Sequence, residues 1–408
     1  MKVPDVALAS APGPTQTPRQ SQVLIALIVG QICLHSCMTG LRMATPLQLL
    51  RMGQAEWAVG IVLGLFAIAP MVIALPAGRM TDRLGYHGPM RIAVLLTVLG
   101  GAMAVASTWL HAGQLPVLCV SAILTGAGTN FGLIAIQRTA GRNAIDGTQL
   151  KRIFSWLGLA PALANVIGPV LAGLMVDWSG FRWAYAALAV LPLMVLLSAR
   201  WVPVEARSSG PAGGASQNSW DLLRVPGVAR LFLVNWLLSA CWDVHAFVVP
   251  ILGHERGFSA SAIGVILGAF AGAVTLVRLI IPSIAHRLHE SQVLVIAMLS
   301  TGAILGVYPM VHTAALMGTC AVLLGLALGS VQPMILTKLH HLTPHHRHGE
   351  AIALRSMTIG LASATMPLLF GVAGAAVGAA SLFWVMGAAV ALGSSQVRRI
   401  DGATMRSG

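Results

Sequence analysis

Long apolar stretches separated by short polar joints fill most of the chain. A helix rises about 1.5 Å per residue and the hydrocarbon core of a bilayer is about 30 Å thick, so about 20 mostly apolar residues are enough to cross it. The pattern predicts twelve membrane-spanning helices, over residues 22–49, 57–77, 91–110, 115–137, 152–176, 181–200, 228–252, 260–284, 292–311, 314–337, 351–375 and 378–396.

The composition is also that of a membrane protein. Of 408 residues, 56% are hydrophobic and 9% are charged, whereas an ordinary soluble domain carries about 25% charged residues. We therefore expect an all-α membrane protein. The five cysteines fall inside apolar stretches without a CxxC pair, so we interpret them as small buried hydrophobes. Residues 1–20 lack the order of a signal peptide, so we expect the first apolar run to stay as an anchor.

The positive charge is placed unevenly along the chain. The net charge is +13, and nucleic-acid binding is one explanation for such an excess. If both termini are cytoplasmic, only four of the 25 Lys and Arg residues fall toward the other side, namely Arg42, Arg51, Arg182 and Arg256. Cytoplasmic loops of membrane proteins have this bias. We therefore expect cytoplasmic termini, a multi-pass protein of a bacterial-type inner membrane, and no nucleic-acid partner.

The chain divides into two similar halves. Residues 202–227 are rich in Gly, Ser, Pro and Ala and predict a flexible cytoplasmic linker. The joint TDRLG at 81–85 has a degraded counterpart, AHRLH, at 285–289. We expect two pseudo-symmetric six-helix bundles with a binding site between them near the midplane. The predicted parts are a tail at 1–21, a bundle at 22–201, the linker at 202–227, a bundle at 228–397 and a tail at 398–408.

The joint between the second and third predicted spans carries a specific motif. Gly78, Asp82, Arg83 and Gly85 resemble the GxxxDRxG signature that the major facilitator superfamily has in this same loop. The resemblance implies a transporter fold of two six-helix bundles. It also implies a cytoplasmic gate at these residues, which holds the halves together and releases when the cavity opens inward. The alternative is an ordinary positive loop, although such a loop has no need of an Asp.

The fifth predicted span contains a second motif, within GLAPALANVIGPVLAG at residues 158–173. Gly168, Pro169 and Gly173 resemble the antiporter motif of the drug-exporting branches of the superfamily. The resemblance favours export over import, while ordinary packing of small residues between membrane helices explains the same letters. Ala122 stands where the best-known proton-coupled drug exporters of the family have an arginine, so that proton-relay residue is missing.

Asp243 is the only carboxylate deep within a predicted span. Asn235 and Ser239 share its helix face, because residues four apart lie on one side. A charge inside a membrane is costly, so such a residue indicates function. We expect Asp243 to gain and lose a proton during transport, since burial disfavours its charge whereas Arg42 or a cationic substrate favours it. The alternative is a structural Asp243 bonded to a neighbouring helix.

Polar residues also occur in other predicted spans. The resemblance implies that the first, fourth, seventh and tenth helices line the substrate cavity, and these are the spans that carry them. The candidate cavity residues are Gln31, His35, Arg42, Asn130, Gln137, Asn235, Ser239 and Gln332.

Together these patterns predict a monomeric secondary transporter that exports small amphipathic organic molecules in exchange for protons. Two alternatives stay open, namely uptake of an organic anion anchored by Arg42, and a transporter-like receptor or sensor without flux. We expect no enzyme activity, because no nucleophile, base and orienting group can be paired. No Walker motif is present, so we expect the proton gradient as energy source and no cofactor. The five histidines within residues 340–348 fit no compact metal motif, which favours a solvated loop over a metal site.

Overall fold

The computed structural model describes residues 18–142, 147–204, 219–284, 289–343 and 348–404, and every regular element in these residues is helical. The first half of the chain forms α1 (Pro18–Arg51), α2 (Glu56–Leu84), α3 (His87–Ser107), α4 (Gln114–Arg142), α5 (Gly147–Val190) and α6 (Leu193–Ala199). The second half forms α7 (Val228–Glu255), α8 (Ala260–Ile284), α9 (Glu290–Val307), α10 (Ala314–Gly329), α11 (Val331–Leu342), α12 (His348–Val377) and α13 (Ala379–Thr404). The prediction of an all-α protein is confirmed for these residues.

Eleven of the described helical stretches are long and apolar enough to cross a membrane. One of them, Trp156–Ala199, has 44 residues and contains Gly180 at φ 81° and ψ 172°, a conformation that glycine adopts readily. The helix is interrupted there, between the spans predicted at 152–176 and 181–200. This stretch therefore supplies two membrane crossings. With the other ten stretches, the described residues contain the twelve predicted crossings.

The helices extend beyond several predicted spans. α1 begins at Pro18 and α13 continues to Thr404, so parts of both predicted tails are helical, and the predicted linker contains a short 3₁₀ helix at Ser219–Arg224. Apolar residues mark only the hydrocarbon region, whereas backbone hydrogen bonds continue a helix past it. The rest of the tails, most of the linker, the degraded second joint and part of the His-rich loop lie outside the described residues, at 1–17, 205–218, 285–288, 344–347 and 405–408.

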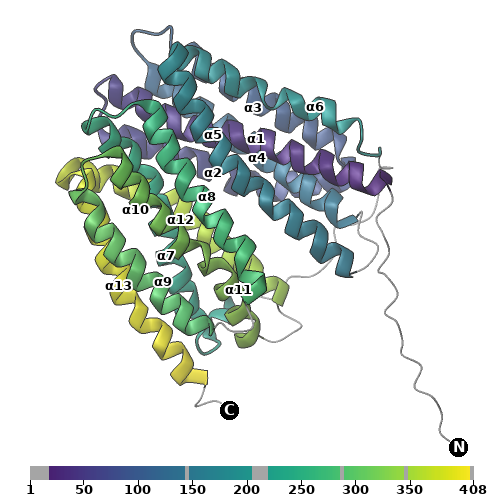
Figure 1. Cartoon of the computed structure of the whole chain (residues 1–408). Coiled ribbons are helices and arrows are strands. Elements are labelled where there is room, and N and C mark those ends of the chain that lie inside the picture. The colour runs from purple at the N-terminus through teal and green to yellow at the C-terminus, as the bar shows by residue number, and fades with distance from the viewer. Residues whose placement is uncertain (1–17, 143–146, 205–218, 285–288, 344–347, 405–408) are drawn as a thin grey trace, which may run out of the picture.

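The crossings form two bundles of six, α1 to α6 and α7 to α13, in which α10 and α11 together make one crossing. We call the end of the molecule where α1 and α7 begin the terminus face, and the end where α2 and α8 begin the far face. Figure 1 shows the purple-to-teal bundle of α1 to α6 and the mainly green-to-yellow bundle of α7 to α13 lying close together at the far face and spreading apart toward the terminus face. The predicted pair of six-helix bundles is confirmed.

Glycines let the two bundles approach closely near the far face. A Cβ added to Gly60 of α2 would lie 2.5 Å from the carbonyl oxygen of Pro367 in α12. A Cβ added to Gly264 of α8 would overlap the carbonyl oxygen of Pro169 in α5. These helices therefore touch through their backbones, as small residues allow in membrane bundles. Among the described residues, the main packed pairs between bundles are α5 with α8, α2 with α12 and α1 with α7.

The buried apolar side chains form two groups. The larger group runs through both bundles and includes Leu47 and Phe66 in the first bundle and Phe247 and Phe270 in the second. The smaller group lies within the first bundle, around Tyr86. The bundles therefore share a core near the far face, while the first bundle has a separate core toward the terminus face.

Candidate functional site

A cavity of about 330 Å³ lies between the two bundles. Its apolar walls include Leu238 and Trp242 of α7 and Ile359 of α12. Polar side chains from six helices also line it: Arg42 of α1, Asn165 of α5, Asn235, Ser239 and Asp243 of α7, Arg278 of α8, Gln332 of α11, and Arg355 and Ser363 of α12. We call this space the larger cavity.

Two hydrogen bonds join α7 to α12 along the wall of the larger cavity. The Ser363 hydroxyl donates to Asp243 Oδ2 at 3.1 Å, and Arg355 Nε donates to Asn235 Oδ1 at 3.2 Å. The two bonds are eight residues apart on each helix, which corresponds to about 12 Å along the axis. Asp243 and Ser363 thus lie deeper in the molecule, and Asn235 and Arg355 lie nearer the terminus face.

Asp243 is 4% exposed, and it is the only buried carboxylate among the side chains that the structure describes. It accepts the Ser363 hydroxyl, and its charge interacts attractively with that of Arg42, which lines the same cavity. Asp243 and Arg42, which the sequence predicts as the proton-coupling residue and a cavity residue, line the same cavity. A carboxyl group with a hydroxyl donor and a cation nearby is able to hold either a proton or a charge.

Arg278 and Arg355 also line the larger cavity. In the sequence they stand near the ends of the spans predicted at 260–284 and 351–375, where they contribute only to the predicted cytoplasmic charge bias. Because both side chains line one cavity, their like charges disfavour each other there. The signal that points to them is an arginine inside an apolar span, which is rare unless it faces a cavity or a partner.

A second cavity of about 70 Å³ adjoins the larger one and shares Arg42, Asn165 and Trp242 with it. Its aromatic wall is formed by Trp242 and Phe270, whose rings meet edge to face with centroids 4.6 Å apart. His245 lines the same space, and its Nε2 lies 3.1 Å from the Tyr308 hydroxyl in a hydrogen bond. His245 lies two residues from Asp243 in the sequence, and the sequence pattern does not predict this aromatic chamber.

The other cavity candidates from the sequence divide into two groups. Ser239 and Gln332 line the larger cavity, whereas Gln31, His35, Asn130 and Gln137 are not among the residues that line either cavity. The Asn130 amide donates instead to the Pro70 carbonyl of α2 at 3.2 Å, because that helix face packs inside the first bundle. Gln137 is exposed near the end of α4, and Gln31 is buried with its Oε1 unpaired among the described residues.

The GxxxDRxG residues lie at the terminus face. Asp82 Oδ1 accepts Arg138 Nε of α4 at 3.0 Å, and both residues belong to the first bundle. A Cβ at Gly78 would meet nothing within 4 Å, and Gly85 has φ 69° in the turn to α3. Arg83 is exposed. Among the described residues, the hydrogen bonds and the ion pair of Asp82 all go to Arg138 of the same bundle, so the gate that the resemblance implies stays a prediction.

The motif in the fifth span forms helix contacts on two sides. Gly168 packs against Thr39 of α1, and Gly173 packs against Ala260 at the start of α8. Pro169 contacts Gly264 of α8 through its carbonyl oxygen. The motif therefore lies where the two bundles touch, which is where a change in their relative tilt would act.

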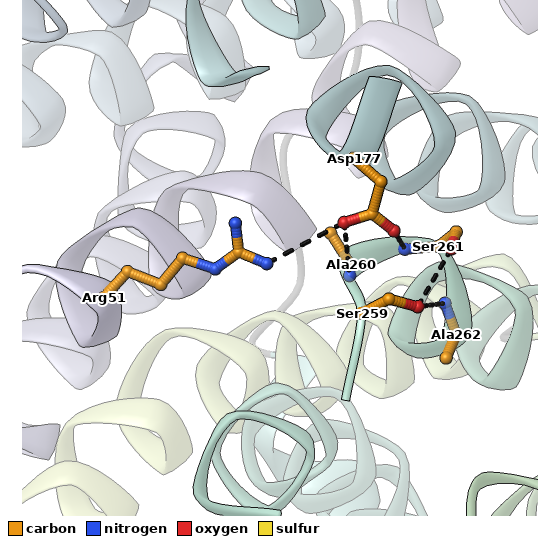
Figure 2. Close-up of polar contacts among 6 residues, drawn as sticks. All are labelled: Arg51, Asp177, Ser259, Ala260, Ser261 and Ala262. Atoms are coloured by element: carbon orange, nitrogen blue, oxygen red, sulfur yellow. Dashed lines mark hydrogen bonds and ion pairs between the residues drawn. The ribbon is translucent and has the colours of Figure 1, made fainter. Parts of the chain in front are cut away.

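Asp177 of α5 joins the bundles at the far face (Figure 2). Its Oδ1 accepts the backbone N–H of Ala260 at 2.9 Å, and its Oδ2 accepts that of Ser261 at 2.6 Å. Arg51 at the end of α1 lies 3.9 Å from the same carboxylate. Unpaired N–H groups and the helix dipole favour an anion at a helix N-terminus. The sequence does not predict this contact, because the partner of Asp177 is backbone from the other half of the chain.

Comparison with known proteins identifies the family. The model of the Major Facilitator Superfamily matches residues 27–314 and 231–396. The chain is 25% identical over 235 residues to multidrug resistance protein D of Escherichia coli, and this match covers 53% of the chain and 56% of that protein. It is 25% identical over 256 residues to the efflux pump azaK of Aspergillus niger, covering 58% of the chain and 53% of the pump. The chain thus spans about half the length of these curated relatives.

A solved structure shares the fold of this chain. A POT family transporter in complex with a thioalcohol-conjugated peptide superposes with a TM-score of 0.75 at 14% identity, over 91% of this chain and 94% of that one. At this identity the likeness shows the fold alone. Since the family model covers most of the chain and the fold agrees with it, the protein belongs to the Major Facilitator Superfamily.

Proposed function

We propose that this protein works by alternating access and exports small amphipathic organic molecules in exchange for protons. The observation that carries the proposal is the buried carboxylate of Asp243 on the wall of the larger cavity, between the two bundles. An intramembrane carboxylate is costly and marks proton or substrate pathways in transporters. Protonation of Asp243 changes the charge of the cavity by one, so proton binding and substrate binding influence each other there.

The arrangement of the bundles supports alternating access. They share backbone contacts and the Asp177 carboxylate at the far face, whereas they spread apart at the terminus face. If the terminus face is cytoplasmic, as the Lys and Arg bias indicates, this state is open to the cytoplasm. Export then requires the far-face contacts to break while the terminus face closes. The two relatives are named for multidrug resistance and efflux, which favours export over uptake.

The test is substrate-driven proton movement in proteoliposomes. The purified protein is reconstituted with a pH-sensitive dye inside, and a panel of small aromatic amines, acids and neutral compounds is added outside. We expect at least one compound to move protons with the wild-type protein. The Asp243→Asn variant should bind that compound without moving protons, while Asp221→Asn, an exposed acid outside the cavity, should behave as wild type.

Two outcomes contradict the proposal. Unchanged proton movement in the Asp243→Asn variant would show that another group carries the proton. Binding of compounds to the wild-type protein without any flux would favour a receptor or sensor. Size-exclusion profiles of each variant verify that the comparison is made between folded proteins.

A further inference from the structure

Arg278 and Arg355 form a pair of like charges on the wall of the larger cavity. Arg355 is 6% exposed, and its Nε donates to a neutral partner, the side-chain oxygen of Asn235. Arg278 Nε is buried without a hydrogen-bond partner among the described residues. Two guanidinium groups that repel each other in a partly buried site are costly unless an anion compensates them.

The acid in the cavity does not compensate this pair. The charged residues that line the larger cavity are Arg42, Arg278, Arg355 and Asp243, so three cations face one anion. Asp243 interacts with Arg42, and it lies about 12 Å deeper along α7 than Asn235, the partner of Arg355. Arg42 is the anion anchor that the sequence predicts, and its charge interacts attractively with that of Asp243. The uncompensated charge lies at Arg278 and Arg355.

The wall next to this pair is apolar and includes an aromatic ring. Trp242 lies seven residues beyond Asn235 on α7, which corresponds to about 10 Å along the helix. Leu238 and Ile359 line the space between them. A flat molecule of about two fused rings has this length, and its face suits contact with an indole ring.

We infer that the larger cavity binds an organic anion, whose carboxylate or sulfonate contacts Arg278 and Arg355 and whose flat apolar body extends toward Trp242. Guanidinium groups bind such oxyanions with paired N–H donors. The inference deepens the proposed function by naming the substrate class, and it rests on the larger cavity being the transport site. It holds for either direction of transport.

The experiment compares three probes of one shape and different charge, namely naphthalene-2-sulfonate, 2-naphthylmethanol and 2-naphthylmethylamine. Binding is measured calorimetrically to the full chain in nanodiscs of zwitterionic lipid. We expect the sulfonate to bind at least about tenfold more tightly than the other two. Arg278→Gln should weaken sulfonate binding by about tenfold, and Arg355→Lys should weaken it less because the charge is kept. Arg224→Gln, at an exposed arginine of the 3₁₀ helix Ser219–Arg224, is the matched control.

Each outcome separates the anion site from the proposed function. Equal binding of the three probes, or no effect of Arg278→Gln, overturns the anion site. Loss of sulfonate binding when phosphatidylglycerol is added to the nanodiscs assigns the pair to a lipid headgroup instead and also overturns it. If the sulfonate binds as expected but moves no protons in proteoliposomes, the anion site stands and the proposed exchange fails. If the amine alone moves protons, the exchange stands and the anion site fails.

Discussion

Asp177 Oδ2, at the end of the fifth crossing, accepts the backbone N–H of Ser261, in the first turn of α8, at 2.6 Å. The two residues belong to different bundles, so this contact closes the far face. The contact consists of the Asp177 side chain bound to the N-terminus of α8. Ser259 caps the same N-terminus, because its hydroxyl accepts the N–H of Ala262 at 3.1 Å. Such a contact breaks without unfolding either helix, which suits a closure that opens in every transport cycle.

Replacing Asp177 by Ala should therefore favour opening of the far face. The lost hydrogen bonds to charged oxygen are worth about 1–2 kcal/mol in total at an exposed site, which shifts the equilibrium about 5–30-fold. Spin labels at Gln54 and Glu255, on opposite bundles, should show a new population at longer distance. The labels are introduced as unnatural amino acids, so that the five native cysteines stay in place. Ser179→Ala, at an exposed site two residues away, should leave the distance distribution unchanged, and an unchanged distribution in Asp177→Ala would remove the closing role.

Two glycines of α8 should respond oppositely to the same change. A Cβ at Gly264 overlaps the backbone of α5, whereas one at Gly272 meets nothing within 4 Å. Gly264→Ala should lower stability by about 1–3 kcal/mol, because it forces the bundles apart. Gly272→Ala should be neutral or stabilising by up to about 1 kcal/mol, because alanine favours helix. Thermal unfolding in detergent measures the change in stability of each variant. Equal changes in the two variants would mean that α5 and α8 are not in backbone contact.

The three tyrosines of the chain are fully buried but differ in their partners. The Tyr308 hydroxyl is bonded to His245, and Tyr185 donates to Gln48 Oε1 at 2.7 Å, while the Tyr86 hydroxyl has no partner among the described residues. Tyr308→Phe removes the hydrogen-bond partner of the buried His245 ring, which costs about 1–3 kcal/mol. Tyr185→Phe should cost less, about 1 kcal/mol, because the Ser107 hydroxyl still donates to Gln48 Oε1 at 3.4 Å. Tyr86→Phe should be neutral or stabilising. The ranking of the three unfolding temperatures checks this prediction, and a destabilising Tyr86→Phe would reveal a missing partner.

Asp82→Asn tests the gate that the GxxxDRxG motif predicts. In the Asp82–Arg138 pair, 64% of the Asp82 side chain is accessible to solvent. Loss of this exposed pair should therefore change stability by less than about 1 kcal/mol. Transport should nevertheless slow about tenfold, corresponding to about 1.4 kcal/mol, if Asp82 holds the bundles together in the opposite state of the cycle. Asp221→Asn removes a comparable exposed pair with Arg224 and should not slow transport. Equal transport rates in the Asp82→Asn and Asp221→Asn variants would show that the motif acts as an ordinary positive loop.

The sequence predicted the fold better than the site. The twelve crossings follow from apolar length, which is a local property, and Gly180 interrupts its helix where the joint between two spans was expected. The sequence alone indicates Asp243 as a candidate, because a carboxylate within an apolar span is rare. Asn130 and Gln137 share a helix face as expected, but the Asn130 amide bonds to the Pro70 carbonyl inside the first bundle. Periodicity shows which residues share a face and leaves open what that face meets.

The amino-acid sequence alone determined the membrane class, the number of crossings and the presence of one intramembrane acid, since each depends on the free energy of moving single side chains from water into lipid. Only the tertiary structure decided that Arg278 and Arg355 face the larger cavity, and that Asp177 binds the backbone of α8. The free energy of placing an arginine near the end of a span is similar whether its guanidinium group contacts a lipid phosphate or lines a cavity. The rotation and tilt of packed helices make that choice, and they depend on contacts between residues that lie far apart in the chain.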